Sequence, residues 1–176
     1  MKARLIVVVM SVLLAVASVG ICDDAVVQGP SSSPDPRVGK LLKEAGLHYM
    51  VDETGDYMLQ CEAVFSSNQA VHVWINSHTS KYSTLEMREI WSAAYRVSGR
   101  ISPEDAENLL MRNGIIKIGS WQIEQYKDHY TVIFSIKCDA TSQTAESLKE
   151  MIEFVALTSD GVAKQIANGK LLPPGL

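Results

Sequence analysis

Apolar residues recur at helical spacing in three segments of the chain. The first, residues 36–45, begins directly after Asp35, a residue type that is favoured as a helix N-cap. The second begins after Ser102 and ends at Gly114, because a small polar residue favours a helix start and glycine a helix end. The third and longest covers residues 144–168. The pattern therefore predicts three helices.

Between these segments the apolar pattern changes to a period near two, which is typical of strands. The predicted strands are 57–65, 71–76, 89–97, 115–126 and 130–137. A polar turn is predicted to begin at Ser77. Residues 84–97 also permit the helical period, and the strand is preferred because a clear helix follows them. Tight turns connect the predicted strands, and the helices lie to the sides. This arrangement predicts an α+β fold, an antiparallel sheet of five to six strands with three helices.

The N-terminus has the pattern of an export signal. Lys2 and Arg4 precede an apolar run that ends near Val19, which is short for a bilayer-spanning helix, although an uncleaved anchor remains the alternative. A segment rich in serine and proline follows, with no apolar period. The chain is thus divided into a signal peptide (1–22), a flexible linker (23–35), an α+β domain (36–170) and a C-terminal tail (171–176). This order predicts an exported protein, periplasmic or associated with the cell envelope.

The three cysteines leave two questions open. Cys22 lies where the acylated cysteine of bacterial lipoproteins would stand, so it is a candidate for lipidation, although the preceding Ile21 is bulky for such a site. The alternative is a flexible mature N-terminus that contains a thiol. Cys61 and Cys138 either form a disulfide in an oxidising compartment or pack as two reduced thiols on separate strands.

The charge balance excludes one class of partner. The sequence has 16 basic and 20 acidic residues, and removal of Lys2 and Arg4 with the signal leaves a net charge of −6 when histidine is counted as neutral. Binding to nucleic acid needs a basic face that displaces counterions from phosphates, and no cluster of basic residues is present. We therefore expect no nucleic-acid partner.

Common catalytic signatures are absent from the sequence. It contains no G-x-S-x-G, H-E-x-x-H, Walker or C-x-x-C motif, so neither an enzymatic activity nor a cofactor is predicted. His72 and His78 could share a metal only if one strand continued through both, and the turn predicted at Ser77 argues against it. An envelope hydrolase with an unrecognised site and a structural envelope lipoprotein remain the alternatives to a binding protein.

Tryptophans supply the candidate contact residues. Trp74, Trp91 and Trp121 all fall in predicted strands, where they form either the core or a platform for a peptide. If the face of the sheet opposite the helices carried Trp91 and Tyr95, these residues would mark an interface. We therefore take Trp91, Tyr95 and Trp121 as candidate binding residues.

Three stretches of the sequence resemble the YbjN family, described as sensory transduction regulators. They are "LLKEAGLHYMVDETGDYMLQ", "ENLLMRNGIIKIGSWQI" and "VIFSIKCDATSQTAESLKEMIEFVALTSDGV", and the resemblance covers residues 36–168. It implies the fold of type III secretion chaperones, which dimerise and bind extended peptide segments, and it implies no enzymatic activity. The export signal and linker depart from the cytosolic members. The sequence as a whole predicts an exported, non-enzymatic protein- or peptide-binding module with a regulatory role, able to form a homodimer, that meets the membrane only through its signal segment or a lipid anchor.

Overall fold

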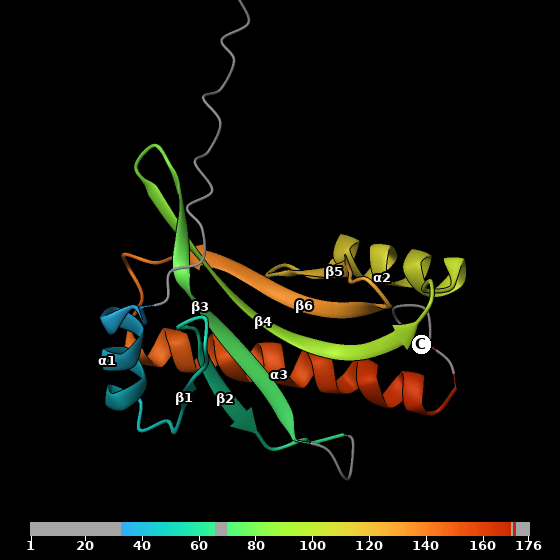
Figure 1. Ribbon diagram of the computed structural model, residues 1–176, viewed down its shortest axis with the longest axis horizontal. Helices are drawn as coiled ribbons and strands as arrows, with labels where there is room; N and C mark the ends of the chain where they lie inside the picture. Colours follow the sequence, from blue (N-terminus) through green and yellow to red (C-terminus); the bar gives the residue numbers. More distant parts are fainter. Residues whose placement is uncertain (1–32, 66–69, 170, 172–176) are drawn as a thin grey trace, which may run out of the picture.

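The computed structural model describes residues 33–65, 70–169 and 171, and it confirms the α+β class (Figure 1). Six antiparallel strands form one sheet in the order β1-β2-β3-β4-β6-β5, accompanied by three helices. The elements are α1 (Pro36–Glu44), β1 (Met50–Val51), β2 (Tyr57–Cys61), β3 (Val71–Tyr82), β4 (Leu85–Ser98), α2 (Pro103–Ile115), β5 (Ser120–Gln125), β6 (His129–Asp139) and α3 (Ala145–Ala167). The predicted signal peptide, Cys22 and most of the predicted linker lie outside the described residues.

Capping side chains begin the three helices. The carboxylate of Asp35 accepts a hydrogen bond from the Arg37 backbone N–H at 2.9 Å, and the hydroxyl of Ser102 accepts one from the Asp105 N–H at 3.0 Å. Thr144 begins α3 with a capping box in which it and Ser147 exchange hydrogen bonds. Each cap satisfies an N–H group that the helix itself leaves without a partner. The three predicted helices are confirmed within one or two residues at their ends.

The helix α3 lies along one face of the sheet and buries the core (Figure 1). Side chains that alternate along the strands point toward it, among them Ile75, Ile90 and Phe134, all fully buried. Each such side chain contributes about 1.5–3 kcal/mol of burial free energy. Leu171, predicted to belong to the C-terminal tail, is also fully buried and joins this core. The opposite face of the strands, called the outer face below, carries His72, Trp74 and Trp91 and is only half-buried there.

The turn predicted at Ser77 is wrong, because β3 continues through this residue to Tyr82. Two extra residues of β3 bulge out between Ile75 and Thr79 against β4. The bulge is held from elsewhere in the chain, since the Ser77 N–H donates to the Asp56 carboxylate and the Ser77 hydroxyl donates to the Gly55 carbonyl, both at 2.6 Å. As a result β3 and β4 form a long hairpin that extends beyond the rest of the sheet (Figure 1).

Two other strand predictions differ in outcome. The strand predicted at 89–97 lies within β4 (Leu85–Ser98), so the preference for a strand over a helix is confirmed. The strand predicted at 57–65 ends at Cys61, because Val64 and Phe65 leave the sheet and donate their backbone N–H groups to the carboxylate of Asp160 on α3.

Candidate functional site

Two stacked tryptophans stand on the outer face of the sheet. Trp74 on β3 and Trp91 on β4 are directly opposite each other in the strand register, and their ring centroids lie 4.6 Å apart with 11° between the planes. The His72 ring lies 5.9 Å from that of Trp74. We call Trp74 and Trp91 the tryptophan stack. Both rings are half-buried and leave part of their surface accessible to a ligand.

The tryptophan stack is fixed by its neighbours. The Trp91 indole N–H donates to the side-chain oxygen of Asn76 at 2.9 Å, and the Asn76 carbonyl accepts a hydrogen bond from the Arg88 guanidinium. Cross-strand aromatic pairs of this kind contribute about 0.5–1.5 kcal/mol beyond their buried area. The two rings are therefore held in one orientation before any ligand arrives.

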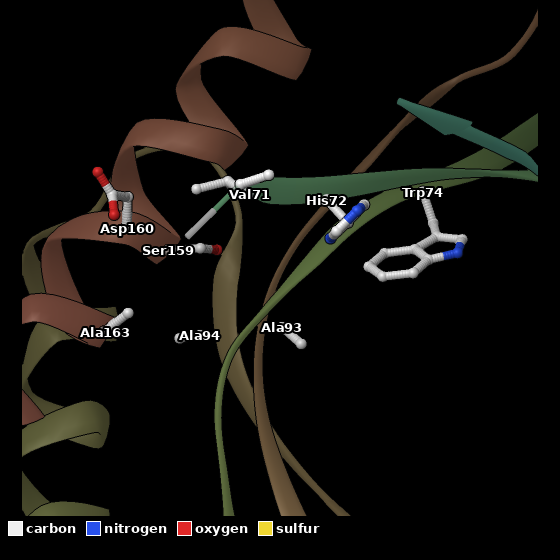
Figure 2. Close-up of a pocket in the computed structure, with 9 residues that line it drawn as sticks. Val71, His72, Trp74, Ala93, Ala94, Ser159, Asp160 and Ala163 are labelled. Atoms are coloured by element: carbon white, nitrogen blue, oxygen red, sulfur yellow. The ribbon is translucent and has the colours of Figure 1, made fainter. Parts of the chain in front are cut away.

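A small cavity opens at one end of the tryptophan stack, where β3 and β4 separate. The two strands pair as far as Trp74 and Trp91, and no pairing between Val71–Val73 and β4 occurs among the described residues. The opening, called the split cavity, has a volume of about 110 Å³ and exposes α3 between the strands (Figure 2). Its lining residues are Ala70, Val71, His72, Trp74, Ala93, Ala94, Ser159, Asp160 and Ala163.

A second hollow lies at the other end of the tryptophan stack, at the base of the β3–β4 hairpin. It has a volume of about 340 Å³, and we call it the hairpin hollow. Its lining residues are Asn76, His78, Ser80, Tyr82, Met87, Arg88, Glu89 and Lys137. Glu89 and Lys137 are opposite each other in the register of β4 and β6, so the hollow carries both signs of charge. Asn76 links the two features, because it lines the hollow and binds Trp91.

Of the three predicted binding residues, only Trp91 belongs to this outer-face site. Trp121 on β5 is 6% exposed and packs in the core, with its ring centroid 5.1 Å from that of Phe134. Its prediction as a contact residue is wrong, because the strand register turns it toward α3. Trp74 and His72 were not predicted to bind, although their alternation with Val71 and Val73 could have placed both on the outer face.

Tyr95 lies on the other face of the sheet from Trp91, so the predicted pairing of these two residues is wrong. A bulge between Ala93 and Tyr95 shifts the register, and Tyr95 comes opposite the core residue Val132. Burial and the nearby charge of Asp105 raise the pKa of Tyr95 to about 12. Its hydroxyl has no hydrogen-bond partner among the described residues.

Cys61 and Cys138 are both free thiols in the structure, which agrees with the alternative of two reduced cysteines and argues against the disulfide. They lie on β2 and β6, and β3 and β4 run between those strands. Three strand spacings amount to about 14 Å, whereas the Cα atoms of a disulfide lie within about 7 Å. Burial raises the pKa of both thiols.

In the described part of the chain, no group of three or more His, Cys, Asp or Glu side chains could hold a metal ion, although β3 does run through both His72 and His78. No helix of this part is long and apolar enough to cross a membrane.

Comparison with known proteins found no relative: no family model matches the sequence, and no curated protein matches it. The resemblance to the YbjN family therefore stays a prediction that rests on the three quoted stretches.

Proposed function

We propose that this protein is an exported, non-enzymatic binding module that holds an extended segment of a partner protein on the outer face of its sheet. The observation that carries this proposal is the tryptophan stack between two hollows. Aromatic side chains on a sheet give large contact area at low entropic cost, and peptide-binding domains use such surfaces with pockets on either side. The bound segment runs from the split cavity over the stack to the hairpin hollow.

The spacing of the site suits a short extended peptide. Along β3 the site reaches from His72, at the split cavity, to Asn76 and His78, at the hairpin hollow. Six strand residues span about 20 Å, so a partner segment of about six extended residues covers the site. Its side chains alternate, and those that face the sheet reach the two hollows while those that face solvent are free to vary.

A second surface supports the proposal that the module is a homodimer. Large aliphatic side chains are exposed on α2 and on the chain that leads from it into β5. They are Leu110, Met111, Ile115, Ile118 and Ile123. Several large apolar side chains exposed on neighbouring segments are candidates for an interface with another protein.

The peptide-binding proposal is tested by selection from a random linear peptide library with the protein in its exported form. We expect selected peptides whose affinity falls at least tenfold in Trp74→Ala, because this change removes one ring of the stack. Tyr126→Ala is the matched control, since Tyr126 is exposed next to the edge strand β5, which β4 and β6 separate from β3. Circular dichroism verifies that both variants fold. Equal binding by Trp74→Ala and the wild type would overturn the proposal, and cleavage of the selected peptides would favour the envelope-hydrolase alternative.

The localisation is tested separately by the intact mass of the protein after detergent extraction from its source cells. An N-terminus at or near residue 22 supports export. An additional mass of acyl chains on Cys22 would show a lipid anchor. A chain that keeps residues 1–22 and stays in the cytosol would contradict the proposal.

A further inference from the structure

The split cavity differs from an ordinary packing defect in its lining. Four of its nine lining residues are alanines, so small side chains leave the space open. Its floor is formed by Ser159 and Asp160 on α3, which are 1% and 2% exposed. Figure 2 shows these two residues with Ala163 on one side of the gap between the strands, and His72 and Trp74 on the other. The cavity therefore connects the outer face with a buried polar group beneath the sheet.

The polar atoms at this floor can accept hydrogen bonds. The Ser159 hydroxyl, which points toward the gap in Figure 2, donates to the carbonyl oxygen of Ser92 at 3.4 Å, and its oxygen can still accept a hydrogen bond. Beside it, the Asp160 carboxylate accepts backbone N–H bonds from Val64 and Phe65 at 2.8 and 2.6 Å. Such bonds favour the ionised carboxylate. A ligand group that donates hydrogen bonds and carries a positive charge is therefore favoured at this floor.

The mouth of the cavity also favours a positively charged group. His72 and Trp74 place aromatic rings at the entrance, and the face of an indole attracts a cation that lies within about 6 Å of it. The lining residues include no lysine or arginine. Aromatic rim, acceptor floor and a buried negative charge together make a site of the kind that binds ammonium groups.

We propose that the split cavity binds the primary ammonium group of a lysine side chain in the partner segment. This inference rests on the proposed function and names the chemistry of its anchor residue. A cavity of about 110 Å³ compares with roughly 30 Å³ for a water molecule, so it holds an ammonium group with part of its aliphatic stem. The ammonium donates a hydrogen bond to the Ser159 hydroxyl in the field of Asp160, and the stem lies against the rings of His72 and Trp74 at the mouth of the cavity.

The test is an NMR titration of the ¹⁵N-labelled protein in its exported form with two probes. Nα-acetyl-lysine methylamide carries the ammonium group, and Nα-acetyl-norleucine methylamide has a similar aliphatic side chain without it. We expect the lysine probe to shift the amide signals of Ala93, Ala94 and Ser159 in a saturable manner, with an affinity at least tenfold higher than that of the norleucine probe. Equal affinities, or shifts confined to other residues, would overturn the proposal.

Two substitutions locate the binding. Ala163→Leu fills the cavity and should abolish the lysine-dependent shifts, whereas Ala167→Leu, on an exposed position of the same helix, should leave them unchanged. If Ala163→Leu does not fold, Asp160→Asn takes its place, because it removes the charge and should reduce the preference for lysine over norleucine. Retained lysine-dependent shifts in folded Ala163→Leu, or an unchanged preference for lysine over norleucine in Asp160→Asn, overturn the proposal. If the NMR test fails but Trp74→Ala still weakens the binding of library peptides, only the lysine anchor is removed. If Trp74→Ala does not weaken that binding, the proposed function itself is removed.

Discussion

Arg88 connects the start of the domain with the outer-face site. Its guanidinium is fully buried, forms an ion pair with Asp35 at the N-cap of α1, and donates to the Asn76 carbonyl beside the tryptophan stack. Burial raises the pKa of Asp35, but hydrogen bonds from Arg37 and Arg88 outweigh this effect and lower it to about 2. A buried charge without its partner is costly, so we expect this ion pair to be sensitive to change on either side.

Asp35→Asn removes the negative partner of Arg88. We expect it to lower the free energy of unfolding by about 3 kcal/mol, because the buried guanidinium keeps its charge and loses its counterion. Urea denaturation measures the difference. Glu44→Gln is the control, since Glu44 forms an exposed ion pair with Lys40 and its loss should cost less than about 0.5 kcal/mol. Similar losses in both variants would show that the Asp35–Arg88 pair has no special role.

The same pair predicts a dependence of stability on pH. The pKa of Asp35 is about 2 in the folded protein against its ordinary value of 3.8, so its contribution is present above pH 4 and is lost as the pH falls toward 2. We therefore expect the stability difference between the wild type and Asp35→Asn to be full at pH 5 and to shrink by pH 2.5. Denaturation curves of both proteins at the two pH values measure it. A difference that does not change with pH would contradict the lowered pKa.

At the scale of elements, the short connection between α2 and β5 is closely fitted. The Asn113 side chain exchanges hydrogen bonds with both backbone polar groups of Trp121, at 2.7 and 3.2 Å, and so occupies part of the exposed edge of β5. Gly119 has φ +85°, and a Cβ atom there would lie 2.6 Å from the Ser135 carbonyl oxygen. This connection therefore requires glycine both for its backbone angle and for its space.

Gly119→Ala should lower the free energy of unfolding by about 3 kcal/mol or more, because the new methyl group meets backbone atoms that cannot move aside. Gly114→Ala is the matched control, since Gly114 lies within α2 and a Cβ atom there has open space. It should stabilise the protein by up to about 1 kcal/mol, because alanine favours a helix more than glycine does. Thermal or urea unfolding compares the two. Equal effects would show that the connection tolerates a side chain.

The bulge of β4 predicts opposite results for two of the sequence-based candidates. Tyr95 faces the core and Trp91 the outer face, so Tyr95→Phe should leave the binding of library peptides unchanged while Trp91→Ala weakens it at least tenfold. Tyr95→Phe should not reduce stability either, since the hydroxyl that it removes is buried without a hydrogen bond among the described residues. Fluorescence titration with a selected peptide measures the affinities. Loss of binding in Tyr95→Phe would place this residue in the site.

At the scale of the whole molecule, the apolar surface of α2 should control the oligomeric state. Leu110 is 70% exposed, and Leu110→Glu places a charge in the middle of this surface. We expect size-exclusion chromatography with light scattering to show a dimer for the wild type and a monomer for the variant. Leu85→Glu, at the exposed tip of the hairpin, is the control and should remain a dimer. A wild type that is monomeric at all concentrations would contradict the homodimer.

The sequence by itself determined the elements that depend on neighbouring residues. Helix periodicity with the caps Asp35 and Ser102 predicted where α1 and α2 begin, and alternation predicted the strands and the antiparallel α+β class. These features follow from contacts within one turn or one hairpin, so a local pattern contains them. The sequence also predicts Trp91 as a candidate contact residue, because a large aromatic side chain in a strand indicates either the core or a contact surface.

Only the tertiary structure decided which face each aromatic residue occupies. A shift of one residue in strand register moves each side chain to the other face of the sheet, and two bulges set the register here. Asp56 and Arg88 hold the bulge at Ser77, and the β4 bulge turns Tyr95 toward the core. The split cavity likewise arises where the consecutive strands β3 and β4 separate above α3, a helix far from both in the chain. No pattern in the sequence contains such an arrangement, because it is fixed by packing between residues that meet only in the folded protein.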